Sequence, residues 1–165
     1  MSLYADTGIF VALYLSDACS GAVQKLAAEF RPHFWMTPLV RAEWSHEVFQ
    51  SISAHKLSAS EARQVLAHFE RDLERGRWRE IAMPKAAVER SMALARAHGH
   101  LRPTTSDTLH VASALELRAI QFWTVSPQAA ALAEAVKLAV VCPGLTEESV
   151  PPLSAPAGKA KRARR

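Results

Sequence analysis

The sequence predicts an α/β domain built on a mostly parallel β-sheet. Short apolar stretches alternate with longer segments whose apolar residues recur at helical spacing, which is the pattern of strands separated by helices. The chain has 165 residues, of which 49% are hydrophobic and 22% charged. These values suit one globular domain whose core needs no disulfide or structural metal. Two cysteines, Cys19 and Cys142, are too few for a disulfide framework and favour a reduced, cytoplasmic setting.

In the first half, a strand that ends before Asp6 opens the chain, and turn and capping residues then separate the helices. Asp17 is a candidate N-cap for the second helix, and Thr37-Pro38 supplies an N-cap followed by proline at the first helical position. Ser58 and Glu61 form a capping-box pattern, and Gly76 ends the helix that follows. The expected elements are strand 2–5, helix 6–15, helix 17–30, strand 34–36, helix 38–52 and helix 58–75.

In the second half, Pro84 stops a strand, and Thr104 or Thr105 begins a helix that is apolar nearly all round, which predicts its burial. The expected elements are strand 78–83, helix 85–98, helix 104–118, strand 122–125, helix 129–136 and strand 138–141. In open parallel sheets ligands bind beyond the carboxyl ends of the strands, so functional residues are sought there.

Residues 1–142 form the predicted domain, and residues 143–165 are expected to be a disordered tail. The tail holds four of the nine prolines and no aromatic residue. It carries five basic and two acidic residues, a net charge of +3 out of the chain's +4. The first 142 residues therefore carry about +1, so the folded part is not a strongly basic nucleic-acid binder, and any nucleic-acid contact there must use a local basic patch or a metal ion. No apolar run is long enough for a transmembrane helix, and we expect no contact with membranes.

Several well-known catalytic motifs are absent from the sequence, and carboxylates are the remaining candidates. The chain contains no GxGxxG, GxxxxGK[ST], GxSxG or HExxH pattern. Asp6 follows the first strand, Glu43 lies in the third helix and Asp107 lies in the first turn of the sixth. Each also has a purely structural interpretation. Asp6 can cap its helix, Glu43 can be a solvated surface residue, and Asp107 can close a capping box with Thr104.

Taken together, three segments resemble the PIN-domain family, and their spacing is similar to that of VapC-type toxins of bacterial toxin–antitoxin pairs. The segment LYADTGIFVALYL resembles the family's opening, in which a strand ends in Asp followed by Thr or Ser. The segment TPLVRAEWSHEVF resembles the second motif, a helix with one Glu, and TTSDTLHVASALELRAIQFWTVS resembles the third. The resemblance covers roughly residues 2–142.

The resemblance implies a three-layer sandwich with helices on both faces of the sheet, and a metal-dependent endoribonuclease. Asp6, Glu43 and Asp107 would then be the catalytic acids and would bind Mg²⁺ or Mn²⁺, with Thr7 beside them. Magnesium takes hard oxygen ligands, which fits carboxylates. The implied partners are an RNA substrate, a cognate antitoxin protein and, as an open alternative, a second copy of the chain.

One position departs from the family pattern. A fourth acid usually follows the fourth strand, and Ser126 stands at that position here. A hydroxyl can support a cation but brings no negative charge. Two other interpretations therefore stay open: a catalytically impaired PIN-like module that binds RNA or protein, and an unrelated α/β protein whose acids are only helix caps. His110, three residues after Asp107, can support the acids, although core packing is the commoner role.

Overall fold

The computed structural model describes residues 2–143 and confirms the predicted fold class. Five parallel strands form one sheet in the order β3-β2-β1-β4-β5. The strands are β1 (Leu3–Ala5), β2 (Phe34–Met36), β3 (Trp78–Glu80), β4 (Gln121–Trp123) and β5 (Val140–Val141). The helices are α1 (Thr7–Tyr14), α2 (Ser20–Phe30), α3 (Pro38–Ser53), α4 (Ala59–Glu74), α5 (Ala87–His98), α6 (Thr105–Glu116) and α7 (Pro127–Ala135), with a 3₁₀ turn η1 (Gly99–Leu101).

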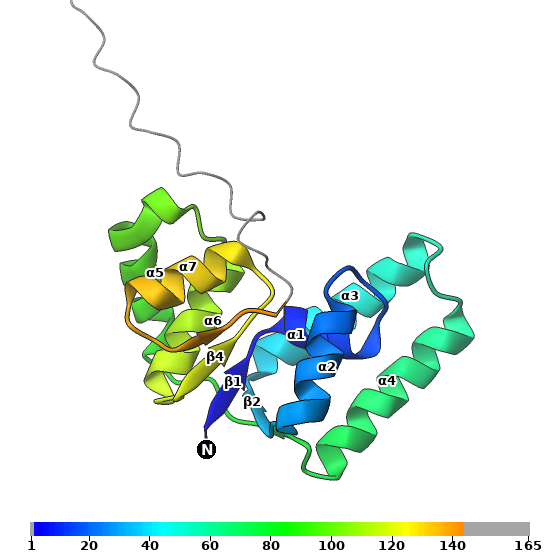
Figure 1. Ribbon diagram of the computed structural model, residues 1–165. Coiled ribbons are helices and arrows are strands. Elements are labelled where there is room, and N and C mark those ends of the chain that lie inside the picture. Colours follow the sequence, from blue (N-terminus) through cyan, green and yellow to red (C-terminus); the bar gives the residue numbers. More distant parts are fainter. Residues whose placement is uncertain (1, 144–165) are drawn as a thin grey trace, which may run out of the picture.

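Helices cover both faces of the sheet and create two cores. Neighbouring strand residues point to opposite faces, so Tyr4 enters one core and Ala5 the other. Phe122 and Trp123 divide in the same way on β4. The helices α1 to α4 pack over the face of Ala5 and Trp123, whereas α5, α6 and α7 pack over the other face (Figure 1). The expected three-layer sandwich is therefore confirmed.

Most element boundaries agree with the prediction, and the differences have local causes. The helix expected from residue 17 begins at Ser20, because the Asp17 carboxylate instead accepts hydrogen bonds from the Cys19 amide and the Ser20 hydroxyl, each at 2.9 Å. The prediction of Asp17 as an N-cap was therefore wrong. Thr37 does occupy the N-cap position of α3, but its side chain makes no capping hydrogen bond.

The later elements are shorter or shifted. The strand expected over 78–83 ends at Glu80, because its partner β2 ends at Met36, the residue paired with Glu80. Apart from this strand and the helix expected from residue 17, the expected ranges differ from the structure by at most two residues at an end. No helix among residues 2–143 is long and apolar enough to cross a membrane. The predicted tail lies, apart from Pro143, outside the described residues.

Candidate functional site

Asp6 leaves the central strand β1 and begins helix α1. Its carboxylate accepts a hydrogen bond from the Ile9 amide at 3.2 Å, and its own amide donates to the Trp123 carbonyl of β4 at 3.1 Å. The side chain is buried, with 5% of the residue exposed. Burial raises the pKa of Asp6, and the nearby charge of Asp107 raises it further, while His110 works in the opposite direction. Asp6 is therefore a helix cap and also a buried acid beside a second acid.

Asp107 uses its two carboxylate oxygens for different partners. Oδ2 accepts hydrogen bonds from the amide and hydroxyl of Thr104, both at 2.8 Å, and the Asp107 amide donates back to that hydroxyl. This is the capping box that the sequence allowed. Oδ1 accepts a hydrogen bond from the Ser126 hydroxyl at 2.9 Å. The structural role of Asp107 therefore engages one oxygen and leaves the other facing the loop that follows β4.

Ser126, the residue at the position of the predicted missing fourth acid, lies beside Asp107. Its hydroxyl also caps α7 by accepting a hydrogen bond from the Ala129 amide at 3.1 Å. The Ser126 amide donates to the Thr124 hydroxyl at 2.9 Å, which fixes the loop between β4 and α7. A carboxylate at position 126 would therefore stand next to that of Asp107.

Glu43 is half-buried on α3 and accepts hydrogen bonds with both of its carboxylate oxygens. Ser106 donates to Oε1 at 2.5 Å, and Thr7 and His110 both contact Oε2, His110 at 2.8 Å. Burial works to raise the pKa of Glu43, but the hydrogen bond and charge of His110 and the hydroxyls of Ser106 and Thr7 outweigh it. The pKa is lowered to about 2, so Glu43 is ionised at neutral pH.

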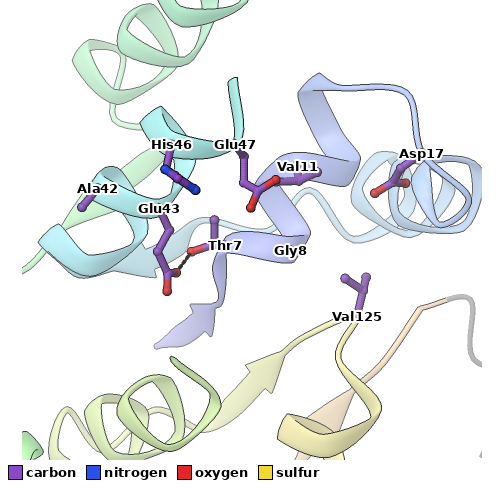
Figure 2. Close-up of a pocket in the computed structure, with 9 residues that line it drawn as sticks. All are labelled: Thr7, Gly8, Val11, Asp17, Ala42, Glu43, His46, Glu47 and Val125. Atoms are coloured by element: carbon purple, nitrogen blue, oxygen red, sulfur yellow. Dashed lines mark hydrogen bonds between the residues drawn. The ribbon is translucent and has the colours of Figure 1, made fainter. Parts of the chain in front are cut away.

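A groove of about 600 Å³ opens beside Glu43, between α1, α3 and the loop after β4. Three acids line it: Asp17, Glu43 and Glu47. Figure 2 shows Glu43 reaching toward Thr7, with Val125 facing the first turn of α1 at Gly8. Asp6 and Asp107 lie outside this lining. The groove is thus acidic and ends at one of the three predicted catalytic residues.

The three predicted acids converge on one end of the sheet, but their side chains do not form one ligand set. Within residues 2–143, no group of three or more His, Cys, Asp or Glu side chains is arranged to hold a metal ion. The donors nevertheless fit a hard cation in kind, because carboxylate and hydroxyl oxygens are what magnesium takes, usually through one or two carboxylates. A buried Asp6 beside Asp107, with a raised pKa, is also a pair that a cation would stabilise.

Sequence reasoning missed or undervalued two residues of the site. Ser106 precedes Asp107, and its hydroxyl donates a hydrogen bond to Glu43. These residues are 63 positions apart, so no local sequence pattern predicts the contact. His110 was assigned mainly to the core, and it is buried, but its ring contacts Glu43. The spacing of three residues from Asp107 was the one signal in the sequence that pointed toward this role.

Comparison with solved structures finds the same fold in bacterial toxins. A Rickettsia felis VapBC2 structure, bound to a DNA fragment from its promoter, aligns with a TM-score of 0.60 over 87% of this chain and 99% of that chain, at 15% identity. Mycobacterium tuberculosis VapC20, described as a sarcin–ricin loop cleaving toxin, aligns with a TM-score of 0.63 over 83% and 96%, at 15% identity.

A toxin–antitoxin complex from Klebsiella pneumoniae aligns with a TM-score of 0.54 over 86% of this chain and 96% of that chain, at 17% identity. No family model and no curated protein matches the sequence. The described residues thus have the PIN-domain fold of VapC toxins, which is the fold that the three sequence segments predicted.

Proposed function

We propose that this protein is a metal-dependent endoribonuclease toxin of a toxin–antitoxin pair, acting in the cytoplasm. The observation that carries the proposal is the convergence of Asp6, Asp107 and Glu43 at the carboxyl end of β1 and β4 in a VapC-like fold. Ligands bind at this end of open parallel sheets. VapC20, which has this fold, is described as a sarcin–ricin loop cleaving toxin, which supports the same class of substrate here.

The chemistry follows from what the side chains can do. Asp6 and Asp107 would hold Mg²⁺ or Mn²⁺, and Glu43 would complete the ligand set. When bound, such an ion supplies an acidified water and a positive charge beside the scissile phosphate. The protein keeps Glu43 ionised through its hydrogen bonds with Thr7, Ser106 and His110. Hydrogen bonds from Thr104 and Ser126 hold the Asp107 carboxylate in one orientation, so little further ordering of this side chain is needed when the substrate binds.

The decisive experiment combines growth on induction with RNA cleavage by the purified protein in Mn²⁺. Asp6→Asn and Asp107→Asn retain side-chain size and capping groups while removing the charge. Each should restore growth and lower cleavage at least about 100-fold, because loss of a ligand should cost no less than loss of a supporting contact. Glu89→Gln, an exposed acid in the first turn of α5, is the matched control and should stay toxic. Equal toxicity of the wild type and both Asn variants, with normal melting curves, contradicts the proposal.

One observation favours a second candidate function, a PIN-like module that binds RNA without cleaving it. Ser126 places a hydroxyl where a carboxylate would stand beside Asp107, so the site has one negative charge fewer. In that case the wild type binds RNA but leaves it intact at every Mn²⁺ concentration. The same assay therefore separates the two functions.

The acidic groove supports an antitoxin as partner. Asp17, Glu43 and Glu47 line one side of the molecule, and an arginine guanidinium pairs with carboxylates in a fork geometry. We propose that a basic antitoxin segment enters the groove and competes with the metal ion. Co-expression of a small protein encoded beside this gene should then restore growth. A complex whose interface avoids Asp6, Glu43 and Asp107 would refute this mode of inhibition.

A further inference from the structure

His110 lies at the centre of a buried chain of hydrogen bonds that ends on Glu43. The ring comes from α6, and 3% of the residue is exposed. Its Nε2 contacts the Glu43 carboxylate at 2.8 Å, and its Nδ1 contacts the Tyr4 hydroxyl at 3.0 Å. The Tyr4 hydroxyl contacts the Thr37 hydroxyl at 3.1 Å. Tyr4 and Thr37 are fully buried, so this end of the chain is shielded from bulk water, whereas Glu43 faces the groove.

The Glu43 carboxylate sets the direction of its hydrogen bond with His110. A carboxylate oxygen accepts, so the His110 Nε2 carries a proton and donates it. On the other side of the ring, Nδ1 lies within hydrogen-bond distance of the Tyr4 hydroxyl, which in turn contacts the Thr37 hydroxyl. The hydroxyls of Tyr4 in β1 and of Thr37 after β2 therefore fix the orientation of the ring.

We propose that His110 is a positioning residue that holds the Glu43 carboxylate ready for the metal ion, with Tyr4 and Thr37 orienting the ring. This inference rests on the proposed function. Without His110, Oε2 of Glu43 keeps only the Thr7 hydroxyl, and the flexible side chain must be ordered when the metal binds. Partners that orient a ligand in this way typically contribute about 10- to 100-fold to metal affinity.

A purely structural role for His110 would leave the geometry of the chain unexplained. Burying an imidazole is costly unless both nitrogens find partners, and an apolar side chain at position 110 would pack without that requirement. Thr37 is the N-cap residue of α3, but its hydroxyl makes no capping hydrogen bond. It contacts the Tyr4 hydroxyl instead and so belongs to the chain of hydrogen bonds that ends on Glu43. Thr7 of α1 and His110 of α6 thus converge on Oε2 of Glu43, while Tyr4 of β1 and Thr37, the residue after β2, support the far side of the His110 ring.

Two substitutions of His110 separate the contact with Glu43 from the contact with Tyr4. The amide nitrogen of glutamine lies as many bonds from Cβ as Nε2 of histidine, so His110→Gln can still donate to Glu43. The amide of asparagine matches Nδ1, so His110→Asn can reach Tyr4 but not Glu43. Tyr4→Phe, which removes only the hydroxyl, provides a third variant in case His110→Asn does not fold.

The measurement is calorimetric titration of the full chain with Mn²⁺, without RNA, so it does not depend on activity. His110→Asn should weaken Mn²⁺ binding about 10- to 100-fold, His110→Gln should stay within about threefold of the wild type, and Tyr4→Phe should fall between them. Ser91→Ala is the matched control. It removes a buried 2.8 Å hydrogen bond from Ser91 of α5 to Thr108 of α6, the helix that carries His110, and should leave Mn²⁺ affinity unchanged.

The possible results separate this inference from the proposed function. Glu43→Gln, measured alongside, tests whether Glu43 takes part in binding at all. If Glu43→Gln weakens Mn²⁺ binding while His110→Asn and Tyr4→Phe bind like the wild type, the positioning role is refuted and the metal site stands. Tighter binding by His110→Asn refutes it as well, because His110 would then compete with the metal for Glu43. A wild type that binds no Mn²⁺ overturns both.

Discussion

Gly8 of helix α1 lies close against Val125 in the loop after β4, and we predict that this contact couples Gly8 to Val125. A Cβ atom added at Gly8 would lie 2.5 Å from Cγ2 of Val125. Carbon atoms pack at about 3.5–4.0 Å, so the valine must retreat by about 1 Å. Valine is stiff about χ1 and cannot swing away freely. Overpacking of this kind costs about 1–3 kcal/mol.

Replacing Gly8 by alanine also has a favourable effect on helix stability, and the matching substitution at Gly21 measures that effect by itself. Alanine is favoured over glycine in helices by up to about 1 kcal/mol. Gly21 occupies the second position of α2, as Gly8 does in α1, but a Cβ there meets nothing within 4 Å. Gly21→Ala should therefore stabilise the protein by up to about 1 kcal/mol. Gly8→Ala should give the same gain minus the clash, a net loss of about 0–2 kcal/mol.

A double-mutant cycle isolates the clash. Val125→Ala removes Cγ2 and should cost about 1 kcal/mol by itself, since the side chain is half-buried. In Gly8→Ala/Val125→Ala the clash is gone, so the double variant should be about 1–3 kcal/mol more stable than the sum of the single changes. Urea unfolding of the wild type, both single variants, the double variant and Gly21→Ala measures every quantity. Additivity within about 0.5 kcal/mol would refute the reasoning.

Two further predictions concern charge at the site. Ser126→Asp retains a capping residue but sets a second carboxylate beside Asp107, where two charges about 4 Å apart repel by about 4 kcal/mol at an effective dielectric constant of 20. The metal-free Ser126→Asp variant should melt at a lower temperature than the wild type. Mn²⁺ should bind it more tightly and restore the melting temperature. Unchanged Mn²⁺ affinity in calorimetry would mean that position 126 does not serve the metal site. The second prediction concerns the pH dependence of stability. The pKa of Glu43 falls from 4.5 to about 2 on folding, so its ionisation adds about 3 kcal/mol to the free energy of unfolding at pH 7. This contribution is lost as the pH drops from about 4.5 to about 2. The stability difference between wild type and Glu43→Gln in urea should shrink over that range, and a constant difference would show that the carboxylate is not preferentially ionised in the folded state.

Local patterns in the sequence predicted the fold class and several helix starts correctly, because they depend on neighbouring residues. The capping boxes of Ser58 with Glu61 and of Thr104 with Asp107 both form, since each joins residues three positions apart. The strands β1, β2, β4 and β5 were recognisable as apolar stretches because each contributes side chains to both cores. Boundaries failed where a distant partner set them, as at Glu80, whose strand stops where β2 stops.

The sequence by itself determined the order of strands and helices, the acids that follow or begin them and the presence of a hydroxyl at position 126. Only the tertiary structure decided what each acid contacts. Thr7 and His110 lie 36 and 67 positions from Glu43, and no periodicity in the chain relates residues that far apart. The parallel crossovers bring β1, α3 and α6 to one end of the sheet, and that packing gives Glu43 three partners while leaving Asp6 buried beside Asp107. The charge and geometry of the site are therefore properties of the folded chain.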